Sequence, residues 1–132
     1  MDNFNTICQQ FGQILNGKPD IENGICSVEL NRDIPVTIQG RPVRGNIETE
    51  IMFENLDQNG YALNRGVTVI LEKEVPYFVH TLVKNGIIIS ALHSNWLYTK
   101  PNILYINFQS VEPPLTFAHK VAEALSTLRV SR

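Results

Sequence analysis

The hydrophobic residues near the amino terminus recur at intervals of three and four positions, which places them on one stripe of a helix. The members of this stripe are Phe4, Ile7, Cys8, Phe11, Ile14 and Leu15. Asp2 or Asn3 can cap the start of this helix through a side-chain oxygen, and Gly17 followed by Lys18-Pro19 ends it. The first element of the chain is therefore predicted to be a helix.

From about residue 24 the hydrophobic spacing changes to two, which is typical of half-buried strands. The alternation predicts strands over 24–31 and 47–54, and a short strand over 36–39 lies between them. In the 47–54 strand, Ile51 and Phe53 share one face with Thr49. The pattern therefore indicates the start of a sheet.

A turn signal, Asp57-Gln58-Asn59-Gly60-Tyr61, follows these strands. A three-residue loop, Gln58 to Gly60, leads into a strand at about 61–71 and sets odd-numbered residues opposite odd-numbered ones. Ile51 would then face Val67, so that apolar side chains pair with apolar ones. We expect this hairpin register.

In the second half of the chain, segments with the helical spacing of hydrophobic residues alternate with segments that have the strand spacing of two. This alternation predicts a helix over 73–85, a strand over 87–92 that is buried on both faces, a strand over 103–109 and a final helix that begins at Pro113-Pro114. The element order is α-β-β-β-β-α-β-β-α. This order is typical of an α+β fold, a largely antiparallel sheet with helices packed on one face. The 132 residues form a single domain, 1–132.

Composition narrows the class of protein. The hydrophobic share of 43% excludes intrinsic disorder, and a net charge of -2 argues against nucleic acid as a partner. No apolar stretch reaches the roughly 20 residues of a membrane helix, so no membrane partner is expected. The amino terminus lacks the basic start of a secretory signal, which predicts a cytoplasmic protein.

The two cysteines, Cys8 and Cys26, have neither the spacing of a metal site nor that of a disulfide framework. Because Cys8 lies on the apolar stripe of the first helix, a buried thiol is the favoured interpretation, and a disulfide between the two cysteines is the less favoured one.

Phosphate-loop, dinucleotide-binding and zinc motifs are absent from the sequence. His80 and His119 lie on polar sides of their predicted helices and are expected to be solvated. His93 differs, because it ends an apolar strand and a hairpin near Lys100-Pro101 would place it opposite Asn107, with Asn95 opposite Tyr105. The predicted ligand site comprises His93, Ser94, Asn95, Trp96, Tyr105 and Asn107. A polar network that satisfies its own groups is the alternative.

Several of these segments resemble the LppY/LpqO-type domain, a bacterial family of unknown function that also occurs in lipoproteins. The resemblance rests on Glu74-Val75, Gly86-Ile87, Ala91-Leu92-His93, Pro101 and the strand Tyr105 to Phe108, and on Phe117-Ala118 and Val121 in the last helix. It runs from about residue 3 to 130 and is most specific over 66–122. Members of the family typically carry three imidazoles where this chain has His93, Asn95 and Asn107.

The sequence leads to a functional hypothesis with two alternatives. A non-catalytic role in binding a small ligand or as an accessory domain is preferred, because no nucleophile, base and orienting residue occur together and no cofactor is indicated. One alternative is a metal-dependent hydrolase or lyase that uses His93. The other is a structural or subunit-interaction domain, in which exposed edge strands pair between chains as a homodimer.

Overall fold

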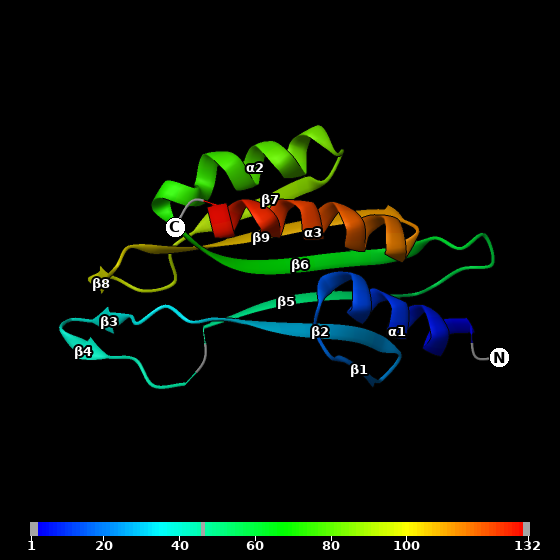
Figure 1. The fold of residues 1–132 in the computed structure, drawn as a ribbon, viewed down its shortest axis with the longest axis horizontal. Coiled ribbons are helices and arrows are strands. Elements are labelled where there is room, and N and C mark those ends of the chain that lie inside the picture. Colours follow the sequence, from blue (N-terminus) through cyan, green and yellow to red (C-terminus); the bar gives the residue numbers. More distant parts are fainter. Residues whose placement is uncertain (1–2, 46, 131–132) are drawn as a thin grey trace.

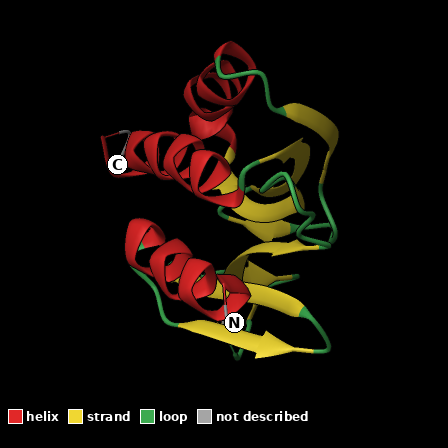
Figure 2. Cartoon of the chain, turned by 90° about the vertical axis from the view of Figure 1, so that its right-hand side faces the viewer, coloured by secondary structure: helices red, strands yellow, loops and turns green. Residues whose placement is uncertain are grey.

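In the computed structural model, which describes residues 3–45 and 47–130, three helices cover one face of a six-stranded antiparallel sheet (Figures 1 and 2). The strands of this sheet follow the order β1-β2-β5-β6-β9-β7, and β3, β4 and β8 form a small second sheet. The elements are α1 (Asn3–Leu15), β1 (Pro19–Glu22), β2 (Ile25–Arg32), β3 (Thr37–Ile38), β4 (Arg41–Pro42), β5 (Ile47–Glu54), β6 (Ala62–Leu71), the short 3-10 helix η1 (Glu72–Glu74), α2 (Val75–Lys84), β7 (Ile88–His93), β8 (Thr99–Lys100), β9 (Ile103–Glu112) and α3 (Pro114–Val130).

The predicted fold class is confirmed: the chain is a single α+β domain with a largely antiparallel sheet and helices on one face. The predicted elements also occur in the predicted order, but the strand predicted over 87–92 is not buried on both faces. It corresponds to β7, which lies at the edge of the sheet and exposes Ile88 and Leu92. The structure adds the short strands β1, β4 and β8, which have two to four residues each and are too short for an alternating pattern to reveal.

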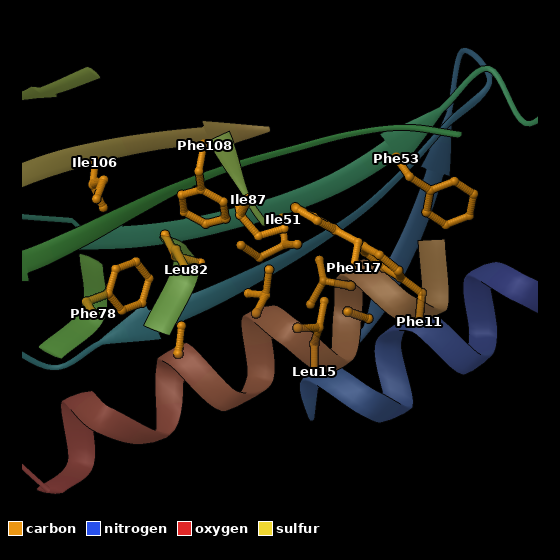
Figure 3. Packing of buried hydrophobic residues seen from close by; sticks show 14 of the residues in the cluster. Phe11, Leu15, Ile51, Phe53, Phe78, Leu82, Ile87, Ile106, Phe108 and Phe117 are labelled. Carbon is orange, nitrogen blue, oxygen red and sulfur yellow. The ribbon is translucent and has the colours of Figure 1, made fainter. Parts of the chain in front are cut away.

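Aromatic side chains fill the layer between the sheet and the helices (Figure 3). Phe11 of α1 and Phe53 of β5 meet edge to face, with ring centroids 4.9 Å apart. Phe108 of β9 contacts both Phe78 of α2 and Phe117 of α3, at 6.0 and 6.2 Å. All five rings are buried, so the apolar stripes of the three helices share one core.

The opposite face of the sheet carries a second, smaller apolar cluster at one end. Val36, Val69 and Ile103 are buried there, because the segment before β3 folds over the ends of β6 and β9. Ile34 and Tyr105 pack against this cluster. The loop-like region between β2 and β5 therefore serves as a partial cover for this end of the open face.

The predicted register of the β5–β6 hairpin is wrong. Ile51 lies opposite Gly66 and Phe53 opposite Asn64, so odd residues of β5 pair with even residues of β6. Gly66 makes this register possible, since a Cβ at its position would collide with the ring of Phe108 and lie 3.1 Å from Cδ1 of Ile51. Apart from Ile70, the core-facing residues of β6 are small or polar, and the Phe108 ring occupies the space above Gly66.

The two cysteines also differ from the favoured interpretation. Cys8 of α1 and Cys26 of β2 form a disulfide, with their Cα atoms 5.7 Å apart and both side chains fully buried. The helical stripe correctly placed Cys8 in the core. It could not show that Cys26, on the inward face of β2, lies directly beneath it.

Candidate functional site

His93 ends β7, and the structure pairs it with a different residue of β9 than the sequence predicted. His93 lies opposite Tyr105, and Ala91 lies opposite Asn107. The register shifts at Ser90, a bulge residue whose hydroxyl donates a hydrogen bond to the Asn107 carbonyl oxygen at 3.3 Å. The predicted pairings of residue 93 with 107 and of residue 95 with 105 are therefore wrong.

Three other members of the predicted cluster lie in an exposed loop, whereas Tyr105 and Asn107 belong to β9. Ser94, Asn95 and Trp96 follow the end of β7, and Trp96 is 51% exposed. The return segment is not a simple hairpin, because β8 pairs with β3 of the small sheet. His93 and Tyr105 stack with ring centroids 6.5 Å apart, so the structure brings these two together and leaves Asn95 outside the strands.

His80 and His119 are exposed, as the helical patterns predicted. Within residues 3–45 and 47–130, no three His, Cys, Asp or Glu side chains gather closely enough to hold a metal ion. A metal centre at His93 would therefore need ligands that this part of the chain does not place there.

A cleft of about 640 Å³ opens elsewhere, between the end of α1 and the second half of α3. α1 ends at Leu15, and the residues at this end of the helix line the cleft together with the second half of β2. None of the six predicted site residues lines it. Its lining residues are Leu15, Asn16, Gly17, Glu29, Leu30, Asn31, Arg32, Asp33, Ile34, Thr49, Leu71, Leu125 and Leu128.

Thr49 of β5 is a polar residue of the cleft lining that belongs to the core-facing side of the sheet. It lies opposite Leu30 of β2 and is 1% exposed, and its hydroxyl has no hydrogen-bond partner. A buried hydroxyl without a partner costs free energy that a ligand group could recover. Thr68 of β6 also carries a buried, unpartnered hydroxyl but does not line the cleft.

Arg32 closes one end of the cleft. Its guanidinium makes a bidentate pair with Glu74, at 2.7 and 2.9 Å, and donates a hydrogen bond to the Val69 carbonyl oxygen at 3.1 Å. Glu74 is fully buried and also accepts a hydrogen bond from the Leu71 backbone N–H. The bidentate geometry fixes the guanidinium plane, so the end wall of the cleft is rigid.

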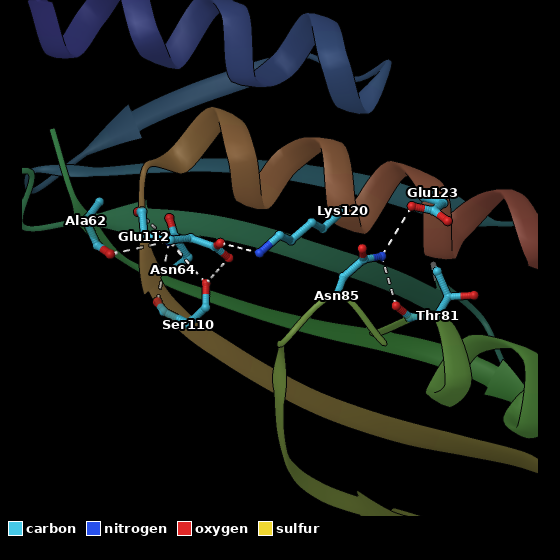
Figure 4. A network of polar contacts seen from close by, with 8 residues as sticks. All are labelled: Ala62, Asn64, Thr81, Asn85, Ser110, Glu112, Lys120 and Glu123. Atoms are coloured by element: carbon cyan, nitrogen blue, oxygen red, sulfur yellow. Dashed lines mark hydrogen bonds and ion pairs between the residues drawn. The ribbon is translucent and has the colours of Figure 1, made fainter. Parts of the chain in front are cut away.

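Other polar networks tie the helices to the sheet rather than line a site (Figure 4). The buried Asn64 amide donates to the carbonyl oxygens of Ala62 and Glu112, and Glu112 pairs with Lys120 of α3 at 2.5 Å. The amide nitrogen of Asn64 is therefore hydrogen-bonded within the core, whereas its side-chain oxygen is buried without a hydrogen-bond partner.

A second polar link joins α2 to α3 at the surface. The ammonium of Lys84 lies 3.0 Å from Glu123, and the amide of Asn85 donates to the same carboxylate at 3.2 Å. The hydrogen bond from Lys84, followed by that from Asn85, holds the pKa of Glu123 below its ordinary value. This link contributes to the docking of α2 and shows no relation to the cleft.

Sequence reasoning missed the cleft because its lining comes from five separate segments of the chain. One signal was visible: Thr49 is a hydroxyl residue in the row of inward-facing apolar residues that includes Ile51 and Phe53. The position of Arg32 in line with the inward-facing Val28 and Leu30 was a second signal. Each is a polar group placed where a core side chain is expected.

Fold and cleft together define a small α+β domain with one helix-covered sheet face and an opening between two helices. Residues 9–127 match the family described as Domain of Unknown Function (DUF1259), and the chain belongs to this family. No curated protein and no solved structure matches the chain.

Among the residues that the structure describes, no helix is both long enough and apolar enough to span a membrane.

Proposed function

We propose that this domain binds a small molecule that carries both apolar and hydrogen-bonding groups, and that the cleft between α1 and α3 is its binding site. The observation that carries the proposal is the Thr49 hydroxyl, buried and without a partner in the lining of a cleft. A ligand that donates to or accepts from this hydroxyl would satisfy it.

The dimensions and chemistry of the cleft support a ligand of this class. Its volume of about 640 Å³ lies within the range of roughly 300–1,000 Å³ that is usual for small-molecule sites. Five leucines and one isoleucine from five different elements or loops supply apolar walls, and six polar or charged residues form most of the remaining lining. The apolar residues are Leu15, Leu30, Ile34, Leu71, Leu125 and Leu128.

A binding role is favoured over a catalytic one by the residue types of the lining. The cleft has no histidine, cysteine or serine among its lining residues, and the hydroxyl of Thr49 has no hydrogen-bonded base beside it. Its arginine is already engaged by Glu74. A metal-dependent hydrolase or lyase that uses His93 remains the alternative from the sequence.

The experiment is a thermal-shift screen of a metabolite library followed by calorimetry on each hit. Thr49→Val removes the hydroxyl, and we expect it to weaken binding about tenfold, the equivalent of one hydrogen bond of about 1.4 kcal/mol. Leu125→Trp fills the cleft and should abolish binding.

Thr68→Val is the matched control, because it removes an equally buried and unpartnered hydroxyl that lies outside the cleft. It should leave the affinity unchanged. The proposal fails if no compound raises the melting temperature, or if Thr68→Val weakens binding as much as Thr49→Val does.

Ligand binding at the surface cluster of His93, Ser94, Asn95, Trp96, Tyr105 and Asn107 stays a second prediction. The stacked rings of His93 and Tyr105 favour a flat ligand there. His93→Ala distinguishes the two sites, since it should not affect a ligand held in the cleft.

We also propose a narrower family assignment and a cellular location for this domain. The motif Ala91-Leu92-His93 and the strand Tyr105 to Phe108 support an LppY/LpqO-type domain of bacterial origin. The cytoplasmic location expected from the amino terminus conflicts with the Cys8–Cys26 disulfide, because disulfides persist mainly in oxidising compartments. We therefore propose that the domain works outside the cytoplasm.

A further inference from the structure

The two edges of the main sheet differ in how they are protected against pairing with another strand. The edge strand β1 has four residues, and among them are Pro19, Asp20 and Glu22. Proline and charged side chains on a short strand are the usual means of blocking an edge. This edge is therefore closed to a further strand.

The opposite edge strand, β7, has none of these features. Its six residues, Ile88 to His93, contain no proline, lysine, arginine or carboxylate. It lies at the outer border of the sheet beside α2, and β9 occupies one side only (Figure 1). The backbone groups on its free side can pair with an incoming strand.

Apolar side chains are also exposed along this edge. Ile88 is 58% exposed and Leu92 is 45% exposed, one on each face of the sheet. Val83 of α2, the helix that contacts β7, is 58% exposed. A strand added at this edge would bury apolar surface as well as form hydrogen bonds.

We propose that β7 pairs antiparallel with β7 of a second copy of this chain, which joins the two sheets around a two-fold axis. A second copy suits this edge because its own β7 is equally free of charge, so no like charges meet across the axis. The blocked β1 edge prevents head-to-tail growth, which makes a closed dimer the outcome.

The bulge at Ser90 selects the register of the pairing. It places Ile89 and Leu92 on the helix-covered face and Ile88 and His93 on the open face. An axis between Ser90 and Ala91 then sets Leu92 opposite Ile89 of the second copy, and Ile88 opposite its His93. This register keeps both helix layers on one side and uses the whole length of β7.

Light scattering and sedimentation equilibrium on the purified chain test the proposal. We expect a mass twice that of the 14.9 kDa chain. Leu92→Lys and Ile88→Lys place a charge on the paired edge and should each weaken dimerisation at least tenfold.

Ile21→Lys is the matched control, because Ile21 is 40% exposed on β1, the opposite edge. It should leave the dimer intact. Circular dichroism confirms that each variant is folded, which is expected because the substituted side chains are solvent-exposed.

Three results would overturn the proposal. A native chain that stays monomeric at every concentration tested excludes pairing with a second copy and leaves a different protein strand as the partner of β7. A mass that grows without limit excludes the closed two-fold arrangement. Dissociation by Ile21→Lys but not by Leu92→Lys assigns the contact to β1.

Discussion

At the scale of single residues, the buried ion pair of Arg32 and Glu74 is important for the stability of the fold. Arg32 comes from β2 and Glu74 from η1, 42 positions later, and the carboxylate is fully buried. Removing one partner from a buried pair is strongly destabilising, because the remaining charge has lost its main compensation. The pair therefore holds the end wall of the cleft in place.

Arg32→Met should lower the free energy of unfolding by about 3 kcal/mol. Urea denaturation measures this, with the midpoint and slope fitted together. Arg65→Met is the control, because Arg65 pairs with Glu54 at the same 2.7 Å but is 46% exposed, and exposed pairs contribute about 0–1 kcal/mol. Equal losses for the two variants would contradict a special role of the buried pair.

At the scale of elements, the registers decide which side chains meet. The bulge at Ser90 moves His93 opposite Tyr105 and takes it away from Asn107. Directly opposite residues of an antiparallel pair have Cβ atoms about 4.5–5.5 Å apart, whereas diagonal neighbours are about 7–8 Å apart. Two imidazoles can share a metal ion at the shorter separation.

Tyr105→His should therefore create a cross-strand histidine pair with His93 that binds Ni²⁺ at least tenfold more tightly than the native chain. Titration calorimetry measures the affinity. Asn107→His, which places an imidazole diagonal to His93, should bind Ni²⁺ no better than the native chain. Tight binding by Asn107→His and none by Tyr105→His would contradict the observed register and support the pairing of residues 93 and 107 that the sequence predicted.

At the scale of the whole molecule, the Cys8–Cys26 disulfide fastens α1 to the sheet. The bridge spans 18 positions and joins the amino-terminal helix to β2. The core stripe of α1 packs on this strand and on α3, so the cross-link supports the helix that forms one wall of the cleft. Closing a loop of this length restricts the unfolded chain.

Replacing both cysteines, Cys8→Ala with Cys26→Ala, should lower the free energy of unfolding by about 3 kcal/mol through loss of the cross-link. Urea denaturation of the native chain with dithiothreitol should show a similar loss without any change of side chain. The double variant should not respond to dithiothreitol. If Cys8 and Cys26 of the native chain react with a thiol reagent before any reductant is added, the disulfide does not form.

The sequence by itself determined the local elements of this protein. The stripe of Phe4 to Leu15 specified α1, and the alternation in 47–54 specified β5, because helix and strand periodicities are properties of neighbouring residues. The positions of Gly17 and Gly86 near the ends of α1 and α2 followed from the same local rules. The α+β class followed from the order of these elements.

Only the tertiary structure decided which residues meet across elements. Gly66 sets the β5–β6 register through the Phe108 ring, and the bulge at Ser90 sets the β7–β9 register. The cleft around Thr49 likewise depends on where α1 ends relative to α3. These contacts join residues far apart in the chain, and their geometry depends on packing in three dimensions, which no local pattern of hydrophobic and polar positions contains.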